Sequence, residues 1–91
     1  MKLIFEWDAA KARANFRKHG ITFEEATTIF GDPRAITITS PKPSEEIRFV
    51  TMGRAESGAL VVVVVHTDRN DRIRIISARP ASRAERRQYQ G

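Results

Sequence analysis

The last quarter of the sequence concentrates side chains that could bind or cleave a phosphodiester. Residues 69 to 91 contain seven arginines and two acids, a net charge of 7 − 2 = +5, which equals the formal charge of the whole 91-residue chain. Arginine suits phosphate because its planar guanidinium donates two parallel hydrogen bonds and stays charged near neutral pH. Such a segment indicates a polyanionic partner, most commonly nucleic acid. The alternative is a basic face that only aids solubility.

Two of these arginines lie on a predicted strand. Arg79 ends the segment "IRIISAR" just before Pro80, so the sheet would hold its backbone while its side chain faces a ligand. The plainer alternatives are an ion pair with a helix carboxylate for Arg79 and an exposed strand position for Arg74. Because the two residues differ by an odd number of positions, strict alternation places them on opposite faces of the sheet. A site that uses both therefore requires a bulge or twist near Ser77.

Glu85 is the single acid among the arginines that follow Pro80. It comes three residues after Ser82, the spacing of a capping box at a helix N-terminus. Its neighbours Arg83, Arg86 and Arg87 are expected to lower its pKa, which suits holding an arginine better than general acid catalysis. We interpret Glu85 first as a cap and second as an orienting residue.

The histidines and the tyrosine each have two interpretations. His19 can exchange a proton near neutral pH, or it can serve only as a cation at a helix C-terminus. His66 ends a run of valines and is interpreted as a structural histidine. Tyr89 either stacks on a base or closes the edge of the core.

The sequence lacks the motifs of metal, nucleotide and thiol chemistry. It has no cysteine, Walker loop, GxGxxG, GxSxG or HExxH, and its histidines lack metal-ligand spacing. We therefore expect no metal and no cofactor. Cleavage of RNA by its own 2′-hydroxyl fits this inventory, because the substrate supplies the nucleophile. The protein then needs only to move protons and stabilise the charged phosphorane.

Cysteine usage and hydropathy predict a cytoplasmic protein without a membrane span. The absence of cysteine excludes disulfides and fits a reducing compartment. The start, "MKLIFEWD", lacks a signal-peptide core, and the longest apolar run, residues 59 to 65, is too short to cross a bilayer.

The first third of the chain predicts a short strand and two helices. Residues 2 to 6 form the strand candidate, and a helix follows between an N-cap at Asp8 and a terminal glycine at Gly20. Its predicted apolar stripe is Ala9, Ala12 and Phe16, and its polar stripe is Lys11, Asn15 and Lys18. A second helix begins at a Thr22/Glu25 capping box and stops at Gly31-Asp32-Pro33.

From residue 36 the pattern changes to the period of strands. Residues 36–38 and 47–52 alternate, and "ALVVVVVH" is typical of a central strand covered on both faces. A hairpin turn at Asn70-Asp71 leads to a strand over 72–79 and then to the terminal helix. We predict an α+β fold, with two N-terminal helices, a four-stranded antiparallel meander and a short C-terminal helix, in a single domain over 1–91.

Three blocks of the sequence together resemble the BrnT toxins of bacterial type II toxin–antitoxin systems. They are "FEWDAAKARANFRKHGITFEEA", "RFVTMGR" and "IRIISARPASRAERRQY", which cover nearly the whole chain in order. The resemblance implies a RelE-like ribonuclease fold and toxicity through RNA cleavage and arrested translation. It also implies site residues at Lys18 and His19 of "KHG", Arg74 and Arg79 of "RIISAR", and Glu85 of "RAER". Pro80 departs from the family, which often has a basic residue there.

The resemblance further implies a partner, a BrnA-type antitoxin with a ribbon-helix-helix DNA-binding domain. The antitoxin would bind operator DNA, and its two-fold symmetry predicts a complex of two toxins and two antitoxins. Contacts with RNA outside the catalytic set are expected from further cations, namely Lys11, Arg69, Arg83, Arg86 and Arg87.

Two other function classes compete with the ribonuclease. A basic nucleic-acid-binding module without chemistry is the main alternative, although "IRIISAR" lacks the stacking aromatics of common RNA-binding platforms. A protein-interaction domain is the third, and it predicts no salt-dependent RNA binding. Either nucleic-acid function predicts affinity that falls steeply with salt, because each neutralised phosphate releases counterions.

Overall fold

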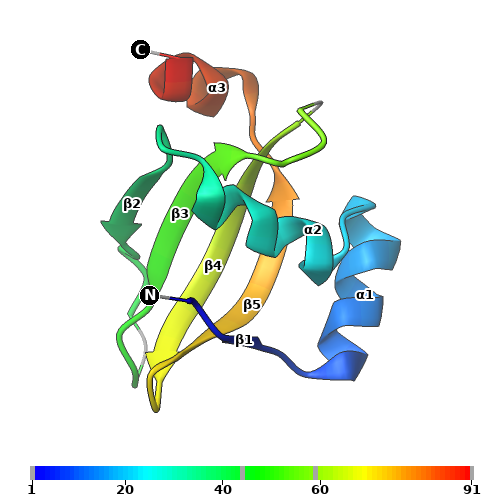
Figure 1. The fold of residues 1–91 in the computed structure, drawn as a ribbon, viewed down its shortest axis with the longest axis vertical. Helices are drawn as coiled ribbons and strands as arrows, with labels where there is room; N and C mark the ends of the chain where they lie inside the picture. The colour runs from blue at the N-terminus through cyan, green and yellow to red at the C-terminus, as the bar shows by residue number, and fades with distance from the viewer. Residues whose placement is uncertain (1, 44, 59, 91) are drawn as a thin grey trace.

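The computed structural model describes residues 2–43, 45–58 and 60–90, which form one five-stranded sheet, three α-helices and a 3-10 helix (Figure 1). In chain order the elements are β1 (Phe5–Glu6), α1 (Ala9–His19), α2 (Phe23–Thr27), η1 (Thr28–Gly31), β2 (Ile36–Thr39), β3 (Phe49–Arg54), β4 (Val61–Arg69), β5 (Arg72–Pro80) and α3 (Arg83–Gln90). The strand order is β1-β5-β4-β3-β2. None of the helices in these ranges is long and apolar enough to cross a membrane.

The predicted α+β class is confirmed, but the sheet is not a four-stranded antiparallel meander. Strands β2 to β5 are antiparallel as expected, whereas β1 adds a fifth strand parallel to β5. Phe5 lies opposite Ile73, and the Ile73 N–H donates to the Ile4 carbonyl at 2.8 Å. Without β1, strand β5 would present an unpaired edge, and a short apolar segment can cover it. Local periodicity identifies such a segment but not its partner.

Helices α1 and α2 cover one face of the sheet (Figure 1). The core on this face joins Phe23, Ala26 and Ile29 to Val62 and Val64 of β4, all fully buried. We call the other side, which carries the alternate β4 residues from Val61 to Arg69, the open face. Helix α3 covers only one end of it, through a smaller cluster of buried residues made of Met52, Val61, Val63, Ala81 and Tyr89.

The predicted helix and turn signals are confirmed. The Asp8 carboxylate accepts from the Lys11 backbone N–H at 3.0 Å, and Gly20 ends α1 in the left-handed region at φ 74°. At the β4–β5 turn, Asn70 and Asp71 have φ of 52° and 63°. Both turn residues tolerate this conformation better than other non-glycine types, as the hairpin prediction required.

The buried position of α1 differs from the predicted apolar stripe. Asn15 is 8% exposed, whereas Phe16 is 51% exposed. The Asn15 amide donates to the carbonyls of Ile21 (3.2 Å) and Ala78 (2.8 Å), and its oxygen accepts from the Ala78 N–H at 3.1 Å. Burial of this polar side chain is stable because its hydrogen bonds are satisfied. These bonds connect α1 to β5 near the C-terminal end of the strand.

Candidate functional site

A β-bulge places Arg74 and Arg79 on the same face of the sheet. The register between β4 and β5 shifts between Val65 and His66, which leaves Ile76 as the extra residue of β5. The paired residues are Val63 with Arg79, Val65 with Ser77, His66 with Ile75 and Thr67 with Arg74. Because directly opposed residues share a face, both arginines lie on the open face. The bulge near Ser77 that a site using both arginines requires is therefore present.

Arg79 is held by a bidentate ion pair with Glu85. Its two terminal nitrogens donate to the two carboxylate oxygens at 2.7 and 2.9 Å, and Nη1 also donates to the Pro80 carbonyl at 3.3 Å. Glu85 additionally accepts from the Ser82 N–H at 2.8 Å and donates its own N–H to Ser82 Oγ at 3.2 Å, which completes the predicted capping box. These bonds, chiefly the one to Arg79, lower the pKa of Glu85 to about 2. The carboxylate thus fixes both the helix end and the guanidinium.

Arg79 and Glu85 line a cavity of about 470 Å³ on the open face. Its other polar side chains come from the β2–β3 segment and from β5, namely Ser40, Lys42, Arg48 and Ser77, and its apolar wall includes Ile38, Val50, Val63, Val65 and Ile76. Three cations and one carboxylate line it, so its formal charge is 3 − 1 = +2. A cavity of this size and charge suits a phosphate ester with its attached sugar.

An apolar groove adjoins this cavity beneath α3. It has a volume of about 420 Å³ and shares Ile38, Val50, Val63 and Glu85 with the charged cavity. Ile36, Met52 and Gln88 complete its lining. The open face therefore combines a cationic half with an apolar half, and one ligand can contact both.

The other predicted arginines of the sheet lie at its opposite end. Arg74 pairs with Glu6 at 3.2 Å, and Arg72 approaches the same carboxylate at 3.9 Å. Arg69 pairs with Glu46 at 3.4 Å. Arg74 shares the face of Arg79 but does not line its cavity.

The predicted site residues of α1 lie in the other layer. Lys18 is exposed and His19 half-buried in the last turn of α1, and Lys11 is exposed near its start. Because α1 packs on the helix-covered face, the structure does not bring these three side chains to the cavity of Arg79.

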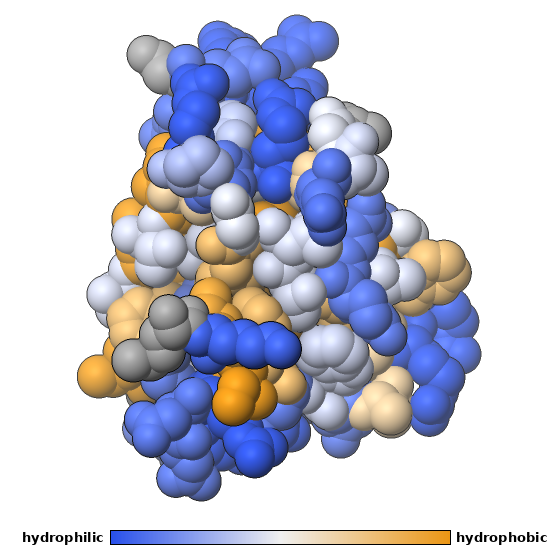
Figure 2. All heavy atoms as spheres, viewed as in Figure 1, coloured by the Kyte–Doolittle hydropathy of each residue, from blue (hydrophilic) through white to orange (hydrophobic). Residues whose placement is uncertain are grey.

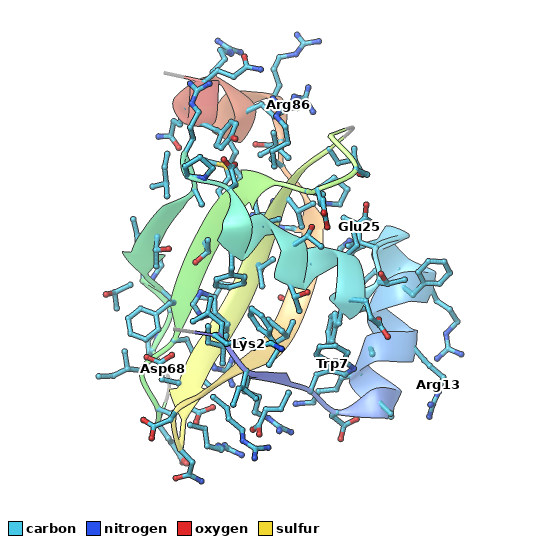
Figure 3. All side chains as sticks on the ribbon, viewed as in Figure 1. Lys2, Trp7, Arg13, Glu25, Asp68 and Arg86 are labelled. Atoms are coloured by element: carbon cyan, nitrogen blue, oxygen red, sulfur yellow. The ribbon has the colours of Figure 1, made fainter. Side chains whose placement is uncertain are left out.

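Helix α3 carries three exposed arginines without carboxylate partners among the described residues. Arg83, Arg86 and Arg87 are exposed and form no ion pair within the described part of the chain, although Arg86 donates to the Ala81 carbonyl at 3.3 Å. Hydrophilic residues accordingly gather over α3 at the top of Figure 2, and Arg86 extends from the same helix in Figure 3. Glu85 of the same helix lines the Arg79 cavity, so the arginines of α3 lie at the end of the molecule that adjoins this cavity.

His66 and Tyr89 are structural side chains. His66 is 5% exposed, lies between Phe30 and Phe49, and shares a 2.7 Å hydrogen bond with Thr51. Burial lowers its pKa. Tyr89 is also 5% exposed, and its hydroxyl donates to Asp32. The burial of both side chains agrees with their structural interpretations, with His66 inside the core and Tyr89 at its edge.

Four polar residues of the cavity were missed by sequence reasoning. Ser40 and Lys42 lie in the segment between β2 and β3, Ser77 was considered only as a bulge position, and Arg48 was recognised only as an alternating strand residue. The alternation correctly places Arg48 beside Val50 and Met52 on the open face. Because β4 pairs with both β3 and β5, Arg48 shares a cavity with residues of β5, and no local sequence pattern reveals this. Within the described residues, no three His, Asp or Glu side chains gather as a metal site.

Comparison with known proteins gives a family match and a structural match. A sequence model described as ribonuclease toxin, BrnT, of type II toxin-antitoxin system matches residues 7–85. The 1.1 Å crystal structure of the Brucella abortus ribonuclease toxin BrnT superposes with a TM-score of 0.66. It is 21% identical and covers 90% of this chain and 100% of that one, so it supports the fold. No curated protein sequence matches the chain.

Proposed function

The chain belongs to the BrnT family of ribonuclease toxins of type II toxin–antitoxin systems, and from this we propose that it is a metal-independent endoribonuclease that inhibits translation. The observation that carries the proposal is the charged cavity of the open face, with an arginine fixed by Glu85. Such preorganised donors stabilise charge that develops during a reaction without needing to reorganise.

In the proposed reaction the RNA supplies its own nucleophile. The 2′-oxygen attacks the adjacent phosphorus and loses its proton, while the bond from phosphorus to the 5′-oxygen breaks and that oxygen gains a proton. The products are a 2′,3′-cyclic phosphate and a 5′-hydroxyl, and no oxidant or metal enters the balance. Arg79 stabilises the charge on the phosphorane oxygens, and Glu85 acts as a positioning residue for Arg79.

Arg83, Arg86 and Arg87 are proposed to bind flanking phosphates. They are exposed and lie on the helix that supplies Glu85 to the cavity. Lys11 and Arg69 stay predictions as RNA contacts, and Lys18, His19 and Arg74 as catalytic residues. All five lie outside the lining of the Arg79 cavity.

The first test is RNA cleavage by purified protein in the presence of EDTA. We expect cleavage to continue and to leave 2′,3′-cyclic or 3′-phosphate ends, which enzymatic end-labelling and mass spectrometry identify. Loss of cleavage on chelation, with recovery on adding a divalent metal, would show the mechanism to be wrong.

Arg79→Ala separates the enzyme from the alternative, a binding module without chemistry. We expect cleavage to fall by orders of magnitude while RNA affinity weakens only modestly, because binding is shared with α3 whereas transition-state charge is stabilised locally. Arg17→Ala, an exposed position on α1, is the matched control. Proportionate loss of binding and activity would favour the module.

A BrnA-type ribbon-helix-helix antitoxin is the proposed partner, in a complex of two toxins and two antitoxins. An uncontrolled ribonuclease would harm its host, so the two proteins must meet in one compartment, which we propose is the cytoplasm. Operator DNA would be bound through the antitoxin. Regulated expression of the chain alone and with its antitoxin, with growth and translation followed, tests this assignment.

A further inference from the structure

Arg48 is the least compensated arginine of the open face. It lies immediately before β3, is partly buried and lines the cavity of Arg79. Its Nε atom is buried without a hydrogen-bond partner, and its guanidinium forms no ion pair among the described residues. A buried polar group left unpaired destabilises a fold. Arg48 therefore lacks the contacts that a structural arginine in this position would make.

The two arginines of the cavity differ in how many of their N–H donors already have an acceptor in the protein. Arg79 directs bonds to both oxygens of Glu85 and to the Pro80 carbonyl. Arg48 has no such acceptor, and the acid beside it, Glu46, pairs with Arg69. With Arg79 paired to Glu85, the net positive charge of the cavity belongs to Arg48 and Lys42, and of these two only Arg48 can offer a planar guanidinium.

Arg48 and Arg79 approach the cavity from opposite sides of β4. Arg48 precedes β3, Arg79 lies on β5, and both strands pair with β4. Backbones two strands apart are separated by roughly 10 Å. Arg79 lies opposite Val63, whereas Arg48 continues the β3 register to a place opposite Thr67, so the two backbones are also displaced by roughly 13 Å along β4. The two long side chains therefore reach the shared cavity from its two ends. Between them lie Val63 and Val65, which have no charge to compete for a ligand.

We propose that Arg48 is a second RNA-binding arginine, which donates through Nε and a terminal nitrogen to the phosphate backbone of RNA lying across β4. A phosphate oxygen would satisfy the orphaned Nε donor, in the bidentate geometry that guanidinium and phosphate favour. This inference rests on the proposed function in that it places RNA at the open face. It does not require that the RNA be cleaved.

The test measures binding and stability together. The probe is a short single-stranded RNA with 2′-O-methyl riboses, which has no free 2′-hydroxyl and so cannot be cleaved by the proposed reaction. For Arg48→Met we expect affinity about tenfold lower and a salt slope smaller by about 0.7, the loss of one phosphate contact. We expect the Tm to stay unchanged or rise, because the variant removes a buried donor that had no partner.

Two further variants make the result specific to the guanidinium at this position. Arg48→Lys keeps the charge but not the planar fork, so we expect an intermediate affinity. Arg13→Met removes an exposed arginine of α1 from the helix-covered side (Figure 3), and we expect a much smaller change in affinity.

Each outcome supports or overturns the assignment. A lower Tm or failure to fold in Arg48→Met would mean that Arg48 is structural, and affinity matching Arg13→Met would mean that it does not contact RNA. Wild-type protein that binds the probe but cleaves no RNA would overturn the proposed enzyme while leaving Arg48 as a binding residue. Wild-type cleavage with unchanged binding and cleavage in Arg48→Met would overturn Arg48 alone.

Discussion

At the scale of single residues, Asn15 links helix α1 to strand β5 by hydrogen bonds. Its side chain makes three hydrogen bonds, two of them to the backbone of Ala78 in β5. For Asn15→Ala we expect a loss of about 2–4 kcal/mol, because the buried Ala78 N–H and C=O lose their side-chain partner. Urea denaturation measures the change, with exposed Arg17→Ala as control. A loss below about 0.5 kcal/mol would mean that water replaces the amide.

The Arg79–Glu85 pair predicts a pH dependence of stability at the same scale. The pKa of Glu85 falls from 4.5 to about 2 on folding, so its charged form stabilises the fold above about pH 4.5. This stabilisation is lost as the pH falls through about 2. For Glu85→Gln we expect a loss of about 1–2 kcal/mol at pH 7, reduced by solvent screening of the half-exposed pair.

The measurement is a series of denaturation curves from pH 7 to pH 2 for wild type and Glu85→Gln. The stability difference should shrink across the acid range, while exposed Glu56→Gln, which has no ion pair in the described part of the chain, should show little difference at any pH. A constant difference would place the role of Glu85 in hydrogen bonding rather than in charge.

At the scale of elements, the bulge of β5 explains how Arg74 and Arg79, which are five positions apart, lie on the same face of the sheet. Deletion of Ile76 would make β5 regular while every other residue keeps its partner and its side of the sheet. We therefore expect this variant to fold, at a cost of up to about 2 kcal/mol for the half-buried side chain. Deletion of Val64 should instead unfold the chain, because it moves the rest of β4 to the wrong face.

Circular dichroism and thermal unfolding distinguish the two deletions. If both variants unfold, the bulge itself is required for the twist of the sheet. If both fold equally well, β4 and β5 can slip in register and the described pairing is not unique.

At the scale of the whole molecule, the charge of α3 predicts how the proposed antitoxin associates. The inhibitor must cover the basic quarter, residues 69 to 91, with an acidic or amphipathic segment. Complementary charge speeds association, whereas buried apolar contacts slow release. For the triple change of Arg83, Arg86 and Arg87 to Glu, we expect an on-rate lower by tenfold or more at low salt. Stopped-flow mixing measures the rate, and light scattering measures the stoichiometry.

A matched control reverses three exposed cations with no assigned role, Lys2, Arg13 and Arg17, and should leave the on-rate nearly unchanged. An unchanged on-rate in the α3 variant would show that the proposed surface is wrong. Antitoxin binding should also raise the Tm by mass action, since it binds only the folded toxin.

The sequence by itself determined the features that depend on neighbouring residues. Caps at Asp8 and Ser82, the end of α1 at Gly20 and the turn at Asn70-Asp71 need only short-range geometry, and all lie where the pattern predicts. The α+β class followed from the change of period. The direction of the Glu85 pKa shift was also predicted, but its largest cause is the hydrogen bond from Arg79 and not the neighbouring arginines of α3. The family blocks, being contiguous segments, were visible for the same reason.

Only the tertiary structure decided which distant residues meet. The pairing of β1 with β5 and the burial of Asn15 in place of Phe16 both satisfy backbone groups far away in sequence. The bulge at Ile76 is likewise set by the pairing of β5 with β4. Arg48 and Arg79 line one cavity because β4 lies between their strands. The order of the strands in the sheet therefore determines that these two residues meet. Hydrophobic periodicity reports which face a side chain takes, whereas hydrogen-bond satisfaction and strand pairing determine what lies beside it.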